Sequence, residues 1–291
     1  MGGPARTVKK SKPRLFVTGG SGFLAINWAC AVRDSWDVIL ATHRHDVALV
    51  GVTAVAVELG DARSLGKELE RINPDLIVHT AGLTDVDRCE ADPAAAHAAN
   101  AILARVVAQA AGNRSVRLVH ISTDHLFSGD RALVSETEPV HPLNEYARSK
   151  WLAEQRVLDA CPDALVVRTN FFGWGHATRR SFSDWLLYNL RAGQTISAFD
   201  DVYFTPVLAD QVVTWIHELV SRDASGVYNV CGDERLSKYE FALRLVAEFG
   251  LPAGLIRRAS VKDAIGPVAL DVSLLSLVGV VVAYLIARSL F

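Results

Sequence analysis

Short apolar stretches alternate with helical stretches along the first 170 residues, and this alternation constrains the fold more than any other feature of the sequence. Val-, Ile- and Leu-rich runs typical of buried strands cover residues 14–20, 37–44, 75–82, 116–123 and 164–173. Helical patterns lie between them at 23–34, 62–74, 92–113 and 141–158. Strands that alternate with helices form a parallel sheet covered on both faces. The sequence therefore predicts an α/β fold with a doubly wound parallel sheet.

The overall composition is that of an ordinary globular protein. Half of the 291 residues are apolar, 21% are charged, and the formal net charge is −2, so no basic surface for nucleic acid is expected. The N-terminal segment lacks the apolar stretch of a secretory signal. The four cysteines are Cys30, Cys89, Cys161 and Cys231, and none of them forms a C-x-x-C pair. This spacing indicates free thiols in a reducing cytoplasm and no metal site.

A glycine-rich turn, "TGGSGFLA", follows the first strand pattern and precedes a helix. Gly19 and Gly22 allow the backbone to approach a pyrophosphate, and the helix N-terminus supplies amide groups and the positive end of its dipole. Ala25 takes the place of a third glycine and still permits close packing of the helix on the strand. In its βαβ context, this turn indicates dinucleotide binding.

The second strand pattern ends in "ATHRHD", where NAD-specific enzymes usually have Asp or Glu. His43 and Arg44 stand there instead, and donor or cationic groups suit a 2′-phosphate. NADP(H) is therefore favoured as the cofactor, while Asp46 leaves NAD(H) as the alternative. If these residues have no function, they simply form a solvated basic loop. Glu58 and Leu59, in "VELGD", are placed where they could flank the adenine.

Hydroxyl and carboxylate side chains follow the fourth strand pattern, in "HISTDHLFSG". Ser122, Thr123 and Asp124 would lie at the carboxyl edge of the sheet, where ligands bind in folds of this class. A hydroxyl at this edge can bond the oxygen of a substrate carbonyl. His120, within the strand, is expected to be a satisfied interior histidine.

Tyr146 and Lys150 share one face of a predicted helix because they are four residues apart. A free tyrosine has a pKa of about 10, and a nearby ammonium favours phenolate and lowers that value. Lys150 could do this and also reach a cofactor ribose. Tyr146 could then give a proton to the oxygen of a carbonyl that receives hydride. With the hydroxyl strand and the glycine turn, the pair predicts catalysis rather than a surface position.

Three motifs together, "TGGSGFLA", "STDHLF" and "YARSK", resemble the extended short-chain dehydrogenase/reductase superfamily. Within it, "DLIVHTAGLTDVDRCEADP", "PLNEYARSKWLAEQ" and "VVRTNFFG" are similar to dTDP-4-dehydrorhamnose reductase and its relatives. The similarity runs from about Arg14 to Val261. It implies that NAD(P)H reduces a 4-keto nucleotide sugar in carbohydrate biosynthesis, and that the protein is a homodimer.

The resemblance also implies a role for each motif residue. Tyr146 would protonate the new alkoxide, Thr123 would orient the carbonyl, and Lys150 would hold the ribose. Asp124 is a weaker candidate for substrate contact. Related sugar dehydratases have Glu where His125 stands, so dehydratase chemistry is disfavoured. The segments beside the cofactor would be Gly22, Phe23 and Leu24 at the pyrophosphate and Ala81, Gly82 and Leu83 at the nicotinamide.

The pattern after residue 170 is looser and suggests a second, smaller lobe. Phe171 and Trp174 are candidate substrate contacts, as are Arg168 and the "DVYFTPV" loop, although each could equally be core. The final stretch from Leu274 to Ala287 is apolar but shorter than the ~20 residues of a membrane span, so a membrane contact is not favoured. It also departs from the family pattern. We expect a disordered leader at 1–12, a Rossmann-type NAD(P)-binding domain at 13–170 and a substrate-binding lobe at 171–291, with the chain free to weave between the two lobes.

Two other functions fit the same residues at this point. The beta subunit of methionine adenosyltransferase is similar to this subgroup, so a regulatory subunit that binds NADP without turnover is one alternative. A nucleotide-sugar epimerase, which recycles its NAD, is the other. An intact Tyr146 and Lys150 pair does not discriminate between the reductase and the regulatory subunit, because a binding protein can retain it.

Overall fold

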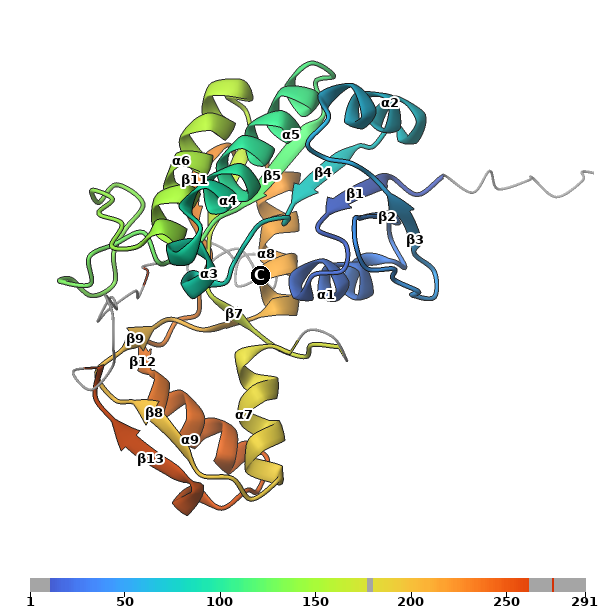
Figure 1. Ribbon diagram of the computed structural model, residues 1–291. Coiled ribbons are helices and arrows are strands. Elements are labelled where there is room, and N and C mark those ends of the chain that lie inside the picture. Colours follow the sequence, from blue (N-terminus) through green and yellow to red (C-terminus); the bar gives the residue numbers. More distant parts are fainter. Residues whose placement is uncertain (1–10, 177–179, 262–273, 275–291) are drawn as a thin grey trace, which may run out of the picture.

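The computed structural model describes residues 11–176, 180–261 and Leu274. Figure 1 shows a larger lobe around a twisted sheet and a smaller lobe of short strands and helices below it. Expectations for residues 1–10 and for the apolar C-terminal stretch beyond Leu274 lie outside the described residues. Leu274 itself is buried against Leu126, Phe127 and Cys231 of the larger lobe.

Within the described residues, the larger lobe is built on seven parallel strands in the order β11-β6-β5-β4-β1-β2-β3. These strands are β1 (Arg14–Thr18), β2 (Asp37–Thr42), β3 (Thr53–Ala56), β4 (Leu76–His79), β5 (Arg117–Ile121), β6 (Leu165–Arg168) and β11 (Gly226–Asn229). The order runs one way from β1 to β3 and the other way from β4 to β11. A ligand crevice is expected where the order reverses, outside the carboxyl ends of β1 and β4. The predicted doubly wound α/β fold is confirmed.

Helices cover both faces of this sheet, and the strands β1, β2, β4, β5 and β6 are accordingly buried on both sides over most of their length. One face carries α1 (Phe23–Val32) and α8 (Ala209–Ser221), which are tied together where Trp28 Nε1 donates to His217 Nε2 at 3.0 Å. The other face carries α2 (Ala62–Ile72), α5 (Leu103–Gly112) and α6 (Glu145–Ala160). The layered arrangement leaves the strand ends open as a binding edge.

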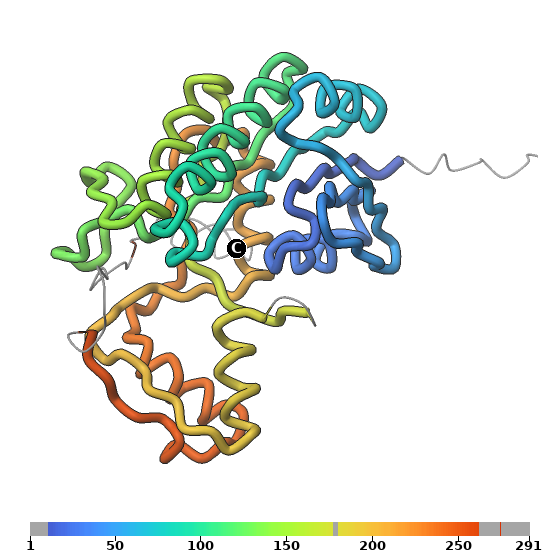
Figure 2. Tube along the Cα trace, in the orientation of Figure 1, coloured from blue at the N-terminus to red at the C-terminus, as the bar shows by residue number. Residues whose placement is uncertain are grey.

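The smaller lobe has its own apolar core, which includes Phe204 and Phe241. Its elements are short, namely α7 (Phe182–Arg191), β8 (Ile196–Phe199), β9 (Tyr203–Phe204), β12 (Leu236–Ser237), α9 (Lys238–Glu248), η2 (Ala253–Leu255) and β13 (Ile256–Ala259). A parallel pair, β7 (Phe171–Phe172) with β10 (Val207–Leu208), connects it to the larger lobe. The trace in Figure 2 returns from this lobe to the sheet through α8 and β11, so the chain passes between the lobes more than once.

Several elements differ from the sequence-based expectation. The strand expected at 164–173 is divided into β6 and β7, and β7 belongs to a separate two-stranded sheet. The edge strand β3 has no prediction, because "TAVA" is short, half alanine and largely exposed. The single helix expected at 92–113 consists of α4 (Pro93–His97), a π-helical turn η1 (Ala98–Ile102) and α5, and a short α3 (Val86–Ala91) precedes it. A π-turn adds a residue to the turn without changing the apolar pattern enough to be seen in sequence.

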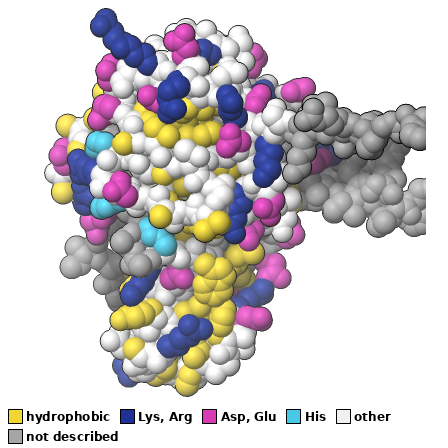
Figure 3. All heavy atoms as spheres, turned by 90° about the vertical axis from the view of Figure 1, so that its right-hand side faces the viewer, with side chains coloured by type: hydrophobic (Ala, Val, Ile, Leu, Met, Phe, Trp, Pro, Cys, Tyr) yellow, Lys and Arg dark blue, Asp and Glu magenta, His cyan; other side chains and the backbone are white. Residues whose placement is uncertain are grey.

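The surface carries charges of both signs over the larger lobe. Figure 3 shows apolar side chains grouped over the smaller lobe, and the exposed large ones include Trp174, Trp185 and Tyr188. Among the described residues, no helix combines the length and the apolar character that crossing a membrane requires.

Candidate active site

A cavity of about 690 Å³ opens at the carboxyl ends of β1, β4, β5 and β6. Residues expected at the site that line it are Gly19, Gly22, Phe23, Leu24, Ala81, Gly82, Thr123, Asp124, Tyr146, Lys150 and Phe171. Residues expected at the site that lie outside its wall are His43, Arg44, Glu58, Leu59, Leu83 and Trp174. Further lining residues, which carried no site prediction in the sequence, include Ser21, His45, Thr80, Thr84, Asn100, His125, Thr169, Asn170, Arg180, Ser181 and Phe182.

The glycine turn between β1 and α1 is shaped for close approach. Gly19 has φ +67°, and a Cβ on it would lie 2.9 Å from the backbone of Ala81. The Gly22 amide donates to the Gly19 carbonyl at 2.7 Å and Gly22 is the N-cap of α1. The turn therefore presents bare backbone and a helix N-terminus to the cavity, which suits a pyrophosphate.

The loop after β2 does not point its predicted residues into the cavity. His43 lies on the surface, 3.4 Å from the Glu58 carboxylate, while Leu59 is buried in the core under the sheet. His45, two residues further along, is the member of this loop that lines the cavity. The sequence locates the loop, but the direction of each side chain depends on how the loop turns.

Tyr146 and Lys150 lie on the buried face of α6 beside the end of β5. The Asn144 side chain caps this helix by accepting from the Ala147 amide at 2.8 Å, which fixes the register of the first turn. The Lys150 ammonium donates to the Ile121 carbonyl at 2.7 Å, and the Tyr146 phenol hydrogen-bonds with Thr123. Three groups from two separate segments thus meet on one wall of the cavity.

Burial controls the proton affinity of this pair. It raises the pKa of Tyr146 to about 12, against the opposing effect of the Thr123 hydrogen bond. It lowers the pKa of Lys150 to about 8, while Glu154 acts in the other direction. The expectation that Lys150 brings the Tyr146 pKa below its usual value is therefore wrong for the protein alone, because desolvation of the phenolate dominates. The phenol remains protonated at neutral pH, as a proton donor must.

Asn100 supports the loop after β4, at the cavity wall, from within the π-turn η1. Its Oδ1 accepts from the Leu83 amide at 2.7 Å, and its Nδ2 donates to the Leu83 carbonyl at 3.0 Å and to the Ser149 hydroxyl at 2.8 Å. A Cβ on Gly82 would lie 2.7 Å from Asn100 Oδ1, so any larger residue there would displace the Asn100 amide from its contacts. The amide thus joins the loop after β4 to α6, the helix that carries Tyr146.

Asp124 is held beside the reacting groups by three polar neighbours. Its carboxylate accepts from Asn170 Nδ2 at 2.5 Å and from the Thr123 hydroxyl at 3.3 Å, and His125 Nε2 lies 3.8 Å away. The residue is 1% exposed. Asp124 therefore has a fixed orientation at the cavity wall.

Two stacked histidines lie behind Lys150, on β4 and β5. His79 and His120 have ring centres 5.3 Å apart, and His79 Nδ1 hydrogen-bonds with the Thr18 hydroxyl at 2.7 Å. Burial first, and then the Lys150 charge, lowers the pKa of His79 to about 3 and that of His120 well below its ordinary value. His120 is interior as expected, but it is not satisfied, since neither ring nitrogen has a partner among the described residues.

Of the candidate substrate contacts near the end of β6, Phe171 lies in the cavity wall, whereas Trp174 and Arg168 lie outside it. Phe171 lines the cavity and stacks on Phe23 at 5.6 Å, whereas Trp174 is 56% exposed and packs against Phe249 outside it. Arg168 is buried and forms a two-pronged ion pair with Glu154, with Arg168 Nη2 2.8 Å from Glu154 Oε2. Arg168 is thus a structural link between β6 and α6.

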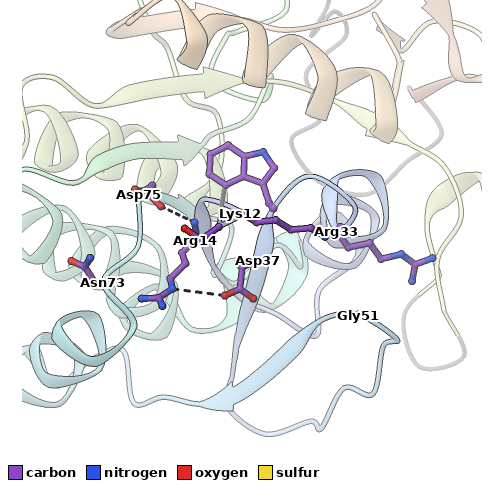
Figure 4. A pocket seen from close by; sticks show the side chains of 9 residues that line it. Lys12, Arg14, Arg33, Asp37, Gly51, Asn73 and Asp75 are labelled. Atoms are coloured by element: carbon purple, nitrogen blue, oxygen red, sulfur yellow. Dashed lines mark hydrogen bonds and ion pairs between the residues drawn. The ribbon is translucent and has the colours of Figure 1, made fainter. Parts of the chain in front are cut away.

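A second cavity, of about 560 Å³, lies at the opposite edge of the sheet (Figure 4). Lys12, Arg14 and Arg33 line it together with Asp37 and Asp75. The Arg14 amide donates to Asp75 at 2.7 Å, and its guanidinium lies 3.8 Å from Asp37. Lys12 and Arg33 each donate to a backbone carbonyl, of Arg33 and of Val50. The cavity is remote from the carboxyl ends of the strands.

Comparison with known proteins agrees with this geometry. A family model described as the RmlD substrate binding domain matches residues 13–269. A probable low-salt glycan biosynthesis reductase of Haloferax volcanii is 29% identical over 87% of this chain and 86% of that protein. The dTDP-4-keto-6-deoxy-D-glucose reductase of Streptomyces niveus is 30% identical over 84% of this chain and 81% of its own length.

Solved structures are also similar to this chain over most of its length. A hypothetical dTDP-4-dehydrorhamnose reductase from Sulfolobus tokodaii has a TM-score of 0.79 and 30% identity, over 90% of this chain and 92% of its own. A dTDP-4-dehydrorhamnose reductase from Bacillus anthracis, solved with NADP, has a TM-score of 0.82 at 24% identity, over 91% of each chain, and shows the shared fold. The chain belongs to the family of the RmlD substrate binding domain, within the extended short-chain dehydrogenase/reductases.

Proposed function

We propose that the protein reduces the keto group of a nucleotide sugar with NAD(P)H, as a dTDP-4-dehydrorhamnose reductase does. The observation that carries this proposal is the meeting of Thr123, Tyr146 and Lys150 in the cavity that also contains the glycine turn. Named relatives that cover most of the chain are reductases of dTDP-linked keto sugars. Both the site and the relatives support an oxidoreductase.

The cavity has the features that a dinucleotide requires. At Gly19 the backbone is so close to Ala81 that a side chain has no space, and the N-terminus of α1 faces the cavity at Gly22. The residues that would hold the cofactor are Gly22, Phe23 and Leu24 at the pyrophosphate, Ala81 and Gly82 near the nicotinamide, and Lys150 at the ribose. When bound, NAD(P)H supplies the hydride.

The reacting carbonyl is oriented and protonated by residues of this chain. The Thr123 hydroxyl would donate to the substrate oxygen and hold it beside the Tyr146 phenol. Because the pKa of Tyr146 is raised to about 12, the phenol carries its proton at neutral pH and can give it to the alkoxide formed at that oxygen.

NADP(H) remains the favoured cofactor, with NAD(H) as the alternative. His45 is the loop residue after β2 that lines the cavity, and His43 and Arg44 remain nearby as candidates for a phosphate contact. We also propose a homodimer and a cytoplasmic location, as the sequence suggests, with a nucleotide sugar as the small-molecule partner. Light scattering of the purified protein tests the dimer.

The test of the function is consumption of NADPH with a dTDP-4-keto-6-deoxy sugar, followed by absorbance. We expect steady consumption by the wild type and a fall of about 10²- to 10⁴-fold in kcat for Tyr146→Phe, because the proton donor is lost. Tight cofactor binding without turnover on any keto sugar would contradict the proposal and favour a regulatory subunit. Conversion of the sugar without net loss of NADPH would contradict it in favour of an epimerase.

A further inference from the structure

Lys238 is the first residue of α9, in the smaller lobe, and its side chain is half-buried. Its ammonium lies 3.3 Å from the centre of the Phe204 ring and 5.3 Å from that of Phe182. No hydrogen bond to it and no carboxylate within 4.0 Å of it are found in the part of the chain that the structure describes. Burial lowers the pKa of Lys238 to about 8. A half-buried ammonium that no carboxylate pairs with among the described residues marks a place where an anion would be stabilised.

The surroundings of Lys238 direct it toward the active site. Phe182 and Asp124 both line the main cavity, and the Asp124 charge raises the pKa of Lys238, so the two groups attract each other. The Asp124 carboxylate is engaged by Asn170 at 2.5 Å and does not reach Lys238 as an ion pair. Lys238 does not itself line the cavity, but its ammonium lies over two aromatic rings, one of which, Phe182, forms part of the cavity wall.

The geometry of the proposed substrate places an anion on this side. Its keto carbon must lie at Thr123 and Tyr146, and its diphosphate leaves the sugar from the anomeric carbon, across the ring. Asp124 follows Thr123 directly, and the smaller lobe begins beyond it at Phe182 and Lys238. We propose that Lys238 binds the diphosphate of the nucleotide-sugar substrate; this inference rests on the proposed function.

The cofactor does not compete for this position. Its pyrophosphate is expected at the Gly19–Gly22 turn, in the larger lobe, whereas Lys238 extends from the smaller lobe. A second cation, Arg180, lines the cavity beside Phe182 and would add to the positive potential. Lys238 is thus a residue for substrate affinity, distinct from the proton donor and from the cofactor contacts.

Calorimetry with dTDP and with thymidine, in the presence of NADP, tests this role. Lys238→Met keeps an unbranched apolar chain close in length to the lysine stem, and thus an apolar contact with Phe204, but removes the charge. We expect it to weaken dTDP binding by about 10- to 100-fold, the typical worth of a charged hydrogen bond. Thymidine and NADPH affinities should stay within about twofold of the wild type, and Lys238→Arg should recover most of the dTDP affinity.

Lys67→Met is the matched control, because Lys67 is exposed on α2 and far from the cavity. Unchanged dTDP affinity in Lys238→Met would overturn the inference, as would a wild type that does not bind dTDP. Equal weakening of dTDP and thymidine would also overturn it, since the loss would then not concern the phosphates. Binding of dTDP through Lys238 without any NADPH consumption would contradict the proposed function and leave this inference standing.

Discussion

Lys150 shows how one buried residue sets the pH range of the site. Its ammonium bonds the Ile121 carbonyl and lies near two neutral histidines, His79 and His120, that cannot share its charge. Its pKa is about 8, so the charged form dominates at neutral pH and is lost above that value. Tyr146, with a pKa of about 12, stays protonated through the same range.

We therefore expect the affinity for NADPH to fall as the pH rises through about 8, the pKa of Lys150. Below that pH the ammonium is present and can bind the ribose hydroxyls, and above it the donor is neutral. Fluorescence titration of NADPH across the pH range measures this. Lys150→Met should bind NADPH more weakly and lose the pH dependence, and an unchanged pH profile in that variant would contradict the assignment.

The lowered pKa of Lys238 affects the free energy of unfolding. Its pKa is lowered from 10.5 to about 8 on folding, so the unfolded chain binds the proton more tightly between those values. The free energy of unfolding therefore rises with pH across that window, and the burial cost is present in full below it. Lys238→Met should raise the free energy of unfolding by about 1–2 kcal/mol near neutral pH, after allowance for the lost ring contact.

Urea unfolding at neutral and at alkaline pH measures this difference. We expect the gap between Lys238→Met and wild type to narrow as the pH rises above about 8, where the wild-type lysine becomes neutral. A less stable Lys238→Met at neutral pH would mean that the ammonium holds the lobe together through Phe204. If Lys238→Met is more stable than the wild type but binds dTDP more weakly, then Lys238 contributes to binding at the expense of stability.

At the scale of elements, the turn between β1 and α1 allows two effects of a glycine substitution to be distinguished. One is the backbone strain of a positive φ, and the other is the clash of a new Cβ with a neighbouring segment. Gly19 and Gly193 have similar φ values, +67° and +71°, but a Cβ on Gly193 meets nothing within 4 Å, whereas one on Gly19 meets Ala81. The two glycines thus form a matched pair.

Gly193→Ala should cost about 1 kcal/mol of stability from backbone strain and leave NADPH affinity unchanged. Gly19→Ala should cost more and weaken NADPH by about 10-fold or more, because the turn must open to remove the clash with Ala81. Thermal unfolding and NADPH titration of both variants check this. Equal effects of the two substitutions on NADPH would show that the close approach at Gly19 is irrelevant to binding.

The regular elements of the sheet and the glycine turn can be predicted because each has a local signal. Buried strands are continuous apolar runs, and "TGGSGFLA" has the composition that a tight turn requires. Tyr146, Lys150 and Thr123 are predictable for the same reason, since a four-residue spacing and a strand end fix where they point.

Other site residues depend on contacts between distant segments, which no local pattern contains. Asn100 reaches Leu83 only because η1 widens one helical turn, and His45 faces the cavity only because the loop after β2 bends. Lys238 looks like an ordinary helix-surface lysine until Phe204 and Phe182 are brought around it. Such residues carry no sequence signal beyond their type.

At the scale of the whole molecule, the site is shared by two lobes with separate cores. NADPH is expected to contact the larger lobe and dTDP the smaller one, so each should protect a different set of amides from hydrogen exchange. We expect NADPH to slow exchange at the start of α1 and after β4, and dTDP to slow it at the starts of α7 and α9. Mass spectrometry of peptides from these segments measures this, and protection of α9 by NADPH alone would contradict the division.

The return of the chain to the sheet has a consequence for how the protein is made. A fragment that ends near residue 170 would leave β6 with an open edge and would uncover the apolar face of α1 that α8 hides. Such a fragment should aggregate rather than fold as a module. We therefore expect the larger lobe to complete its folding during synthesis only after β11, which ends at Asn229, has left the ribosome.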